Sequence, residues 1–271
     1  MNLNPLNGAE IRRQAASIVR ENRGKMTLAI ALAVGINLLL QACLMLMGVT
    51  GGEDEPALVT LLSNFVTLLV SAPLQYGVFE MFIRISRGQP GRIRDIGAWF
   101  SDGERLRTSL LGSLWFNLLT TLWLLLYTVP FAMVYGLLLL RMPQLIFAQT
   151  WLVLALVLLL MTEVILYLPG MFMLAEQPSR PIISTFSESR RGMKPFRWKF
   201  FGVYIVYALQ VVACVVPLTL AVVYLGGEAL RDAYFTVLLV TASLAMLWVA
   251  PRLYTGGILY WRAVFEQDAQ D

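Results

Sequence analysis

The stretch "FSESRRGMKPFRWKFFG" (186–202) brings five basic and five aromatic side chains into seventeen residues. Basic residues beside aromatic rings are typical of nucleic-acid surfaces, where the cations bind phosphates and the rings stack on bases. They are also typical of the cytoplasmic end of a membrane span, where the cations face anionic headgroups and the rings lie in the interfacial belt. An apolar run follows, from Phe200 to Leu225. It favours the membrane interface, so we expect no nucleic-acid partner.

The composition of the whole chain supports this choice. Of its 271 residues, 58% are hydrophobic and only 14% are charged, whereas soluble domains average roughly 45–50% apolar and about 25% charged residues. The chain has no histidine, which removes the commonest general base and the commonest metal ligand. Its two cysteines, Cys43 and Cys214, lie in apolar runs and lack metal-ligand spacing. We therefore predict neither a metal nor another cofactor.

Six apolar segments are each long enough to cross the ~30 Å hydrocarbon core of a bilayer as a helix. These predicted spans cover residues 26–47, 57–83, 109–140, 144–174, 200–225 and 233–261. Lys and Arg concentrate in the N-terminal segment 1–25 and in the connections 84–107 and 175–199, whereas only Arg141 and Arg231 fall in the other connections. The positive-inside rule then predicts a multi-pass plasma-membrane protein with both termini in the cytoplasm.

Each basic segment also carries apolar residues at helical spacing, which predicts an interfacial amphipathic helix ahead of the next span. These residues are Ile11, Ala15, Ile18 and Val19 in the first segment, Ile93, Ile96 and Phe100 in the second, and Ile182, Phe186 and Met193 in the third. The predicted fold is a single all-α membrane domain over residues 1–271. Two interpretations of its organisation stay open: three repeated units of one amphipathic helix and two spans, or a chance likeness among apolar helices.

Polar side chains inside the predicted spans are candidates for function, because placing them in lipid is costly. Glu163 is the clearest of them. It could bind a proton or cation near the midplane, or pair with Arg252, or simply lie at the inner interface. Three single amides would belong to a transport site only if they converged with Glu163 on one cavity, and are otherwise interhelical hydrogen-bonding residues: Asn37, Asn117 and Gln210.

Charged residues near the ends of the spans have more conventional roles. Glu80 and Arg84 stand one turn apart at the inner end of the second span, which predicts an i, i+4 ion pair. In the opening stretch, six side chains are the predicted contacts to anionic phospholipid headgroups: Arg190, Arg191, Lys194, Arg197, Trp198 and Lys199.

A family resemblance rests on motifs at both ends of the chain. They are Arg13-x-Ala15 and Asn22-Arg23-Gly24-Lys25 before the first span, and then Glu188-Ser189, Met193-Lys194 and Trp198-Lys199-Phe200 on entry to a later one. With these motifs the chain resembles a bacterial integral membrane family known only as a domain of unknown function, which is related to the membrane domain of some glycerophosphoryl diester phosphodiesterases. Pro195 stands where that family is expected to have glycine. The resemblance implies lipid or glycerol-phosphate surroundings, and it carries no catalytic residue onto this sequence.

The sequence shows no nucleophile motif, phosphate-binding loop or catalytic carboxylate pair. We therefore expect a non-catalytic membrane scaffold or accessory protein, which contacts the lipid bilayer and its anionic headgroups, or a membrane-protein partner, through its basic helices. A small-solute or lipid transporter that uses Glu163 is the alternative hypothesis. A membrane enzyme of lipid metabolism is the third, and it would need two facing carboxylates or a carboxylate and a hydroxyl within reach of each other.

Overall fold

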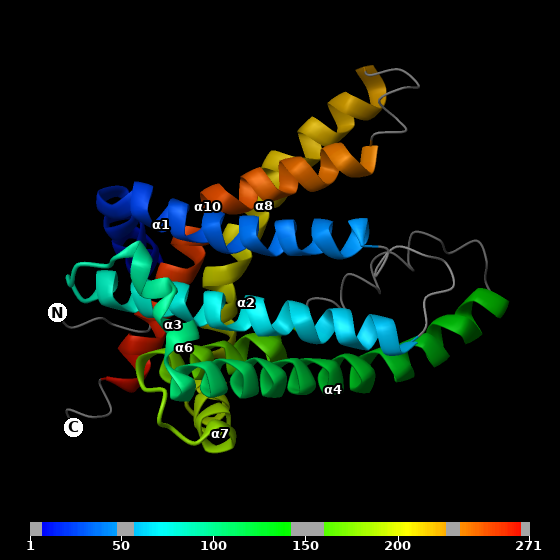
Figure 1. Ribbon diagram of the computed structural model, residues 1–271. Helices are drawn as coiled ribbons and strands as arrows, with labels where there is room; N and C mark the ends of the chain where they lie inside the picture. The colour runs from blue at the N-terminus through cyan, green and yellow to red at the C-terminus, as the bar shows by residue number, and fades with distance from the viewer. Residues whose placement is uncertain (1–6, 48–56, 142–159, 226–233, 267–271) are drawn as a thin grey trace.

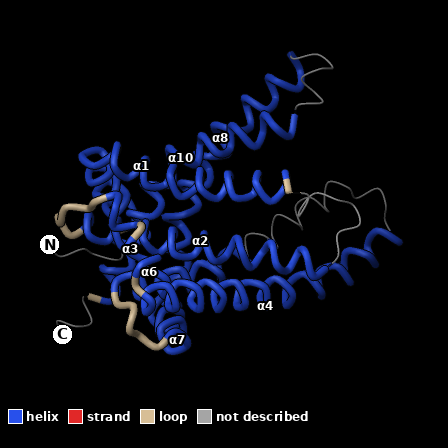
Figure 2. The backbone as a smooth tube through the Cα atoms, viewed as in Figure 1, coloured by secondary structure: helices blue, strands red, loops and turns tan. Residues whose placement is uncertain are grey.

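The computed structural model of the protein describes residues 7–47, 57–141, 160–225 and 234–266. The regular secondary structure of these residues is helical (Figure 2). An α label marks an α-helix and an η label a short 3₁₀ turn. The elements are α1 (Gly8–Leu46), α2 (Ala57–Ser86), η1 (Ile93–Ile96), α3 (Ala98–Ser101), α4 (Gly103–Arg141), η2 (Ile165–Tyr167), α6 (Leu168–Glu176), α7 (Ile182–Met193), η3 (Lys194–Phe196), α8 (Arg197–Leu225) and α10 (Tyr234–Phe265).

Four helical segments among the described residues are long and apolar enough to cross a membrane: Gly8–Leu46, Leu58–Ser86, Gly103–Met133 and Ile182–Val215. They contain most of the predicted spans 26–47, 57–83 and 109–140 and the first part of 200–225. The predicted span 233–261 falls on α10. Part of the predicted span 144–174 lies outside the described residues, and its remainder is helical at 160–164 and continues through η2 into α6. The all-helical fold is therefore confirmed for the described residues, four of whose helical segments are candidate membrane spans, while six spans stay a prediction.

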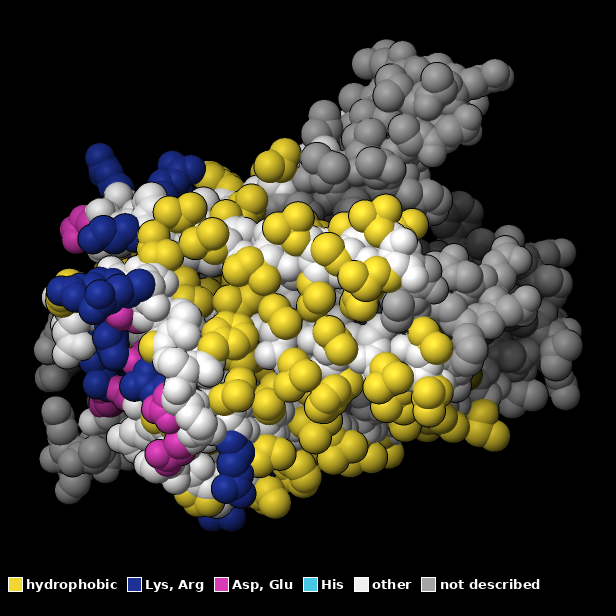
Figure 3. All heavy atoms as spheres, in the orientation of Figure 1, with side chains coloured by type: hydrophobic (Ala, Val, Ile, Leu, Met, Phe, Trp, Pro, Cys, Tyr) yellow, Lys and Arg dark blue, Asp and Glu magenta, His cyan; other side chains and the backbone are white. Residues whose placement is uncertain are grey.

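The long helices are arranged side by side with their charged residues at one end. In Figure 1, α1, α2 and α4 run next to one another, and the far halves of α8 and α10 lean away from them. α1 packs against α2 and α10, and α10 packs against α8. Figure 3 shows Lys, Arg, Asp and Glu gathered at one end, with apolar side chains along the rest of the visible face. We call this the charged end; it comprises the starts of α1, α4 and α8, the ends of α2, α6 and α10, and all of η1, α3, α7 and η3.

The best-packed core lies close to the charged end. The ring of Phe79 on α2 meets Phe172 of α6 and Tyr254 of α10 edge-on, with centroid distances of 5.1 and 5.3 Å. In a second cluster, Phe200 of α8 lies 5.1 Å from Tyr260 of α10. Except for Tyr254, which is half-buried, these rings are almost completely buried. Edge-on aromatic contacts are favourable beyond the area they bury, so these clusters hold the helices together where the charges are.

Farther along α4 the packing is different. Leu118, Leu122 and Leu126 are 55–60% exposed, and α4 carries no charged residue between Arg107 and Arg141. Exposed leucines over a long uncharged helix are what a surface facing lipid requires, because only apolar side chains are tolerated there.

Two of the three segments that were predicted to be amphipathic are helical. The first forms the start of α1, which Asn7 caps by accepting a hydrogen bond from the Glu10 backbone N–H at 3.3 Å, and which kinks at Asn22. Its apolar residue Ile11 is fully buried. The third is α7, whose residues Phe186 and Met193 are buried. The predicted apolar faces of both helices therefore pack inward.

The second segment is not one helix, contrary to the prediction. It consists of η1 and the single turn α3, which bury Ile96 and Trp99 and leave Phe100 42% exposed. The backbone of this segment lies close against α2: a Cβ atom on Gly77 would be only 2.7 Å from the Ile96 Cα and carbonyl oxygen. The three repeated units therefore stay a prediction.

Candidate functional site

Glu80 is the acceptor at the centre of a first group of polar contacts, which joins α2 to η1, α3 and α4. Its side chain is 12% exposed and accepts from Arg84 at 2.5 Å, from Arg105 at 3.0 Å and from the Trp99 indole N–H at 2.7 Å. Arg84 also contacts Asp95 at 3.3 Å. The predicted Glu80–Arg84 ion pair is confirmed. Arg105 and Trp99 were not predicted as its partners, because only the tertiary fold brings them to Glu80.

Glu163 forms the second group. Its side chain is 9% exposed and pairs with Arg197 at 2.8 Å and with Arg190 at 3.3 Å. Arg252 is not a partner of Glu163, because its guanidinium stacks on the Trp248 ring at 4.6 Å. Both partners come from the basic segment 175–199, one from α7 and one from the first turn of α8. This geometry supports the inner-interface hypothesis for Glu163 over the hypothesis of a free intramembrane carboxylate.

Two aromatic side chains complete the surroundings of Arg190. Its guanidinium lies 5.2 Å from the Trp123 ring and 6.0 Å from the Tyr167 ring, and the Trp123 indole N–H donates to the Tyr167 hydroxyl at 3.1 Å. A cation over an aromatic face is stabilised most where water is excluded. Trp123 and Tyr167 gave no sequence signal, since single aromatics in apolar runs are ordinary, and their role appears only when α4, η2 and α7 meet.

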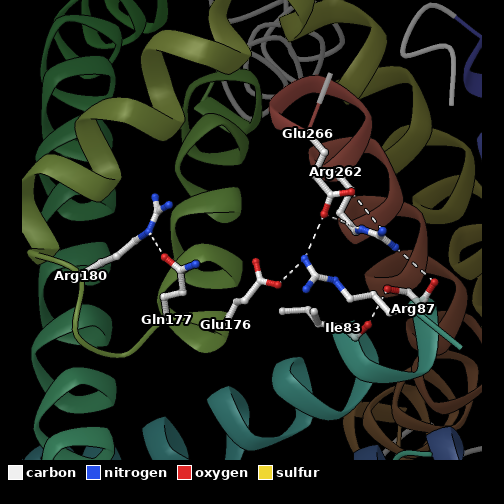
Figure 4. Close-up of polar contacts among 8 residues, drawn as sticks. Ile83, Arg87, Glu176, Gln177, Arg180, Arg262 and Glu266 are labelled. Atoms are coloured by element: carbon white, nitrogen blue, oxygen red, sulfur yellow. Dashed lines mark hydrogen bonds and ion pairs between the residues drawn. The ribbon is translucent and has the colours of Figure 1, made fainter. Parts of the chain in front are cut away.

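The third group of polar contacts lies at the charged end, where α2, α6 and α10 end (Figure 4). Arg87 forms ion pairs with Glu176 and, at 2.9 Å, with Glu266. Arg262 binds both Glu266 oxygens at 3.0 Å and donates to the Ser86 carbonyl oxygen at 3.2 Å. Bidentate hydrogen bonds between Arg and a carboxylate fix the orientation of the two groups as well as their distance. The spacing of Arg262 and Glu266 is an i, i+4 signal; Arg87 and Glu176 have no comparable signal.

A cavity of about 280 Å³ lies beside this third group. Its walls include donors and acceptors in comparable number: Arg87, Arg180, Glu176, Gln177 and Glu188. Arg180 bonds Gln177 at 2.7 Å and reaches Glu188 at 3.5 Å. The cavity is suited to a small polar molecule that carries both signs of charge. Among the described residues, no cluster of three or more His, Cys, Asp or Glu side chains could hold a metal ion.

Burial and neighbouring charges move the pKa values of the two carboxylates in opposite directions. Burial raises the pKa of Glu176 above its ordinary value of 4.5, and the nearby Arg87 opposes this only in part. Burial would also raise the pKa of Glu266, but its hydrogen bonds and charge interactions with Arg262 and Arg87 outweigh that effect and lower the pKa. The two acids share Arg87, so Glu176 is the one that is incompletely compensated.

The six predicted headgroup residues divide into two sets. Arg190 and Arg197 turn inward to Glu163. The other four are exposed: Arg191, Lys194, Trp198 and Lys199. Within the described part of the chain, the cations Arg191, Lys194 and Lys199 have no ion-pair partner. Trp198 is 60% exposed, and the Arg197 guanidinium lies 5.2 Å from its ring.

The residues of the family-like motif are mostly structural. The buried Ser189 hydroxyl donates to the Leu166 carbonyl oxygen at 2.7 Å, which fastens α7 to η2. Met193 and Phe200 are fully buried, and Glu188 reaches Arg180. The remaining motif residues, Lys194, Trp198 and Lys199, are exposed.

The three amides do not join Glu163. Asn117 is exposed on α4, and Asn37 donates to the Ala33 carbonyl oxygen of its own helix at 2.8 Å. Gln210 is half-buried on α8. Among the described residues, no hydrogen bond or ion pair connects any of the three to Glu163.

Comparison with known proteins adds no assignment: no protein-family model, curated protein or solved structure matches the chain.

Proposed function

We propose that the chain is a multi-pass membrane protein without catalytic activity, which acts as a scaffold or accessory protein and holds anionic phospholipid headgroups at its charged end. The division of the cations within residues 186–202 carries this proposal. Two arginines neutralise Glu163, and the remaining Arg191, Lys194 and Lys199 point outward beside an exposed tryptophan. Unpaired cations beside an interfacial aromatic are the combination that attracts an anionic leaflet, with about 1 kcal/mol per cation near the surface.

The topology that we propose has six spans, with the charged end on the cytoplasmic side of a bacterial inner membrane. The four long apolar segments and the helical α10 support this number. α1 begins and α10 ends at the same end of the molecule (Figure 1), which supports placing both termini on one side. The basic residues at that end favour the cytoplasmic side.

The relation to the family of unknown function, and through it to the membrane domain of glycerophosphoryl diester phosphodiesterases, is part of the same proposal. Its support is limited to the motifs quoted above. A membrane-protein partner is compatible with the scaffold role, since the exposed apolar faces of the long helices could receive other helices as well as lipid.

The transport hypothesis receives less support. It requires Glu163, Asn117 and Gln210 to surround one cavity, and it requires a carboxylate free to bind a proton or cation. Glu163 is instead paired with two arginines, and Asn117 faces outward. A membrane enzyme would need an acid poised against a second reactive group, whereas Glu176 and Glu266 both bind Arg87.

The proposal can be tested by comparing two double variants with the same loss of charge. Lys194→Gln/Lys199→Gln removes outward-facing cations, and Arg141→Gln/Arg231→Gln removes cations from connections predicted to lie on the opposite side. Each protein is reconstituted in equimolar phosphatidylglycerol and phosphatidylcholine, and the lipids that it retains in mild detergent are quantified by mass spectrometry. We expect the first variant to lose several-fold of the phosphatidylglycerol enrichment and the second to keep it. Equal enrichment in both variants and in the parent would refute the proposal.

A further inference from the structure

An apolar groove runs between α4 and α7 at the border of the charged end. Its volume is about 510 Å³, within the range of small-molecule sites. Its walls are formed by apolar side chains of both helices: Leu111, Leu114, Trp115 and Leu118 of α4, and Ile182 and Ile183 of α7. Ile183 is 63% exposed, so the groove is open to the surroundings.

The position of the groove along α4 matches the boundary between headgroups and acyl chains. Arg107 is the last charged residue of α4 before Arg141, and the groove begins one helical turn later at Leu111. Positions 107, 111, 114 and 118 share one face of a helix. Arg107 therefore stands at the mouth of the groove, and the groove extends from there into the uncharged part of α4 for about 10 Å.

The charge at this mouth is uncompensated. The neighbouring Arg105 is paired with Glu80 and Asp102, but Arg107 is exposed and has no ion pair with any described residue. The mouth is also fixed in place, because the Thr108 hydroxyl donates to the Pro178 carbonyl oxygen at 2.8 Å and so ties α4 to the segment that leads into α7.

We propose that this groove is a binding site for one anionic phospholipid, with an acyl chain between α4 and α7 and the phosphate on Arg107. The occupant is argued from complementarity: a single cation at one end of an elongated apolar groove matches a phosphate attached to a hydrocarbon chain. This inference rests on the proposed function, since it assumes that the charged end lies in the headgroup layer, and it deepens that function from general attraction to one defined site.

The test is native mass spectrometry of the full-length protein with added phosphatidylglycerol or phosphatidylcholine at equal concentration. Leu114→Trp fills the groove from α4, Ile183→Trp fills it from α7, and Arg107→Gln removes the cation. Two matched controls make the same changes elsewhere: Leu126→Trp on the exposed face of α4 and Arg94→Gln on η1. Having two filling variants keeps the test decisive if one of them does not fold.

We expect the parent to retain one phosphatidylglycerol and little phosphatidylcholine. Arg107→Gln should weaken this retention about tenfold, which is what the loss of one charge-assisted contact costs. The two filling variants should also weaken it, because they occupy the space of the acyl chain, while both controls match the parent. Parent-like retention in all groove variants would overturn the proposal, and so would equal retention of the two lipids by the parent. If that happened while Lys194→Gln/Lys199→Gln still reduced the general enrichment, the groove would be wrong and the proposed function would stand.

Discussion

The charged end is packed differently from the apolar parts of the same long helices, which we call their shafts. At the charged end, aromatic side chains such as Phe79, Phe172 and Trp99 are fully buried, and each partly buried carboxylate there has at least one arginine. Along the shaft of α4, leucines such as Leu122 remain largely exposed. The first region is packed like the core of a soluble domain, and the second presents apolar side chains to lipid. We infer that the specific tertiary contacts of this protein are concentrated at the charged end.

The strongest test of this contrast removes one large side chain from each region. Phe172→Ala should lower the free energy of unfolding by about 3–5 kcal/mol, because it opens a cavity among Phe79 and Trp261. Leu122→Ala should change it by less than about 0.5 kcal/mol, as is usual at surfaces. Unfolding in mixed micelles with increasing denaturing detergent measures both. Equal losses would show that the shafts are packed as firmly as the charged end.

A second test concerns the carboxylate of Glu163. Glu163→Gln should lower the free energy of unfolding by about 3 kcal/mol, because it breaks a buried ion pair. This value is at the lower end for such a change, since Arg190 and Arg197 are each about one-third exposed. Glu21→Gln, at an exposed carboxylate with no ion pair among the described residues, is the matched control and should have little effect. If Glu163→Gln left stability unchanged, the pairing would be dispensable and the case for a titrating, functional carboxylate would reopen.

A third test addresses the close packing of η1 on α2. Gly77→Ala should cost roughly 1–3 kcal/mol, because the added Cβ would stand 2.7 Å from the Ile96 backbone, which cannot yield as a side chain can. Gly35→Ala in α1 is the control: nothing lies within 4 Å of its Cβ position, and alanine is the better helix former. A stability of the Gly77→Ala variant equal to or above that of Gly35→Ala would contradict the packing described here.

The smallest expected effect is the pH dependence of the third group. The pKa of Glu176 is raised by burial, so the folded state binds more protons than the unfolded state just above pH 4.5, and stability should fall as pH rises through that window. The pKa of Glu266 is lowered, so its contribution is present above pH 4.5 and is lost as pH falls below it.

Thermal midpoints measured between pH 3.5 and 7 should resolve the two carboxylates. We expect Glu176→Gln to flatten the curve above pH 4.5 and Glu266→Gln to flatten it below. A Glu176→Gln curve that keeps the parent's slope above pH 4.5 would count against the incomplete compensation of Glu176.

Much of the local structure could be predicted from the sequence because it depends on periodicity and composition. Apolar runs of sufficient length defined most of α1, α2 and α4, and the helical spacing of Phe186 and Met193 predicted the buried face of α7. The pair Glu80–Arg84 followed from one-turn spacing. The same reasoning failed at residues 93–101, because periodicity does not report tertiary contacts such as the close approach of the Ile96 backbone to Gly77 on α2.

By itself, the sequence determined that this protein is helical, that its long helices are apolar enough for a membrane, and that its charges belong to a few short segments. Those properties are sums over neighbouring residues, and they depend on the free energy of transferring each side chain from water to an apolar environment. Only the tertiary structure decided which charges face inward. It assigned Arg190 and Arg197 to Glu163, left Lys194 and Lys199 outside, and formed an apolar groove between α4 and α7. Partners that lie 27 to 34 residues apart along the chain meet only when helices pack, and no local pattern records that meeting.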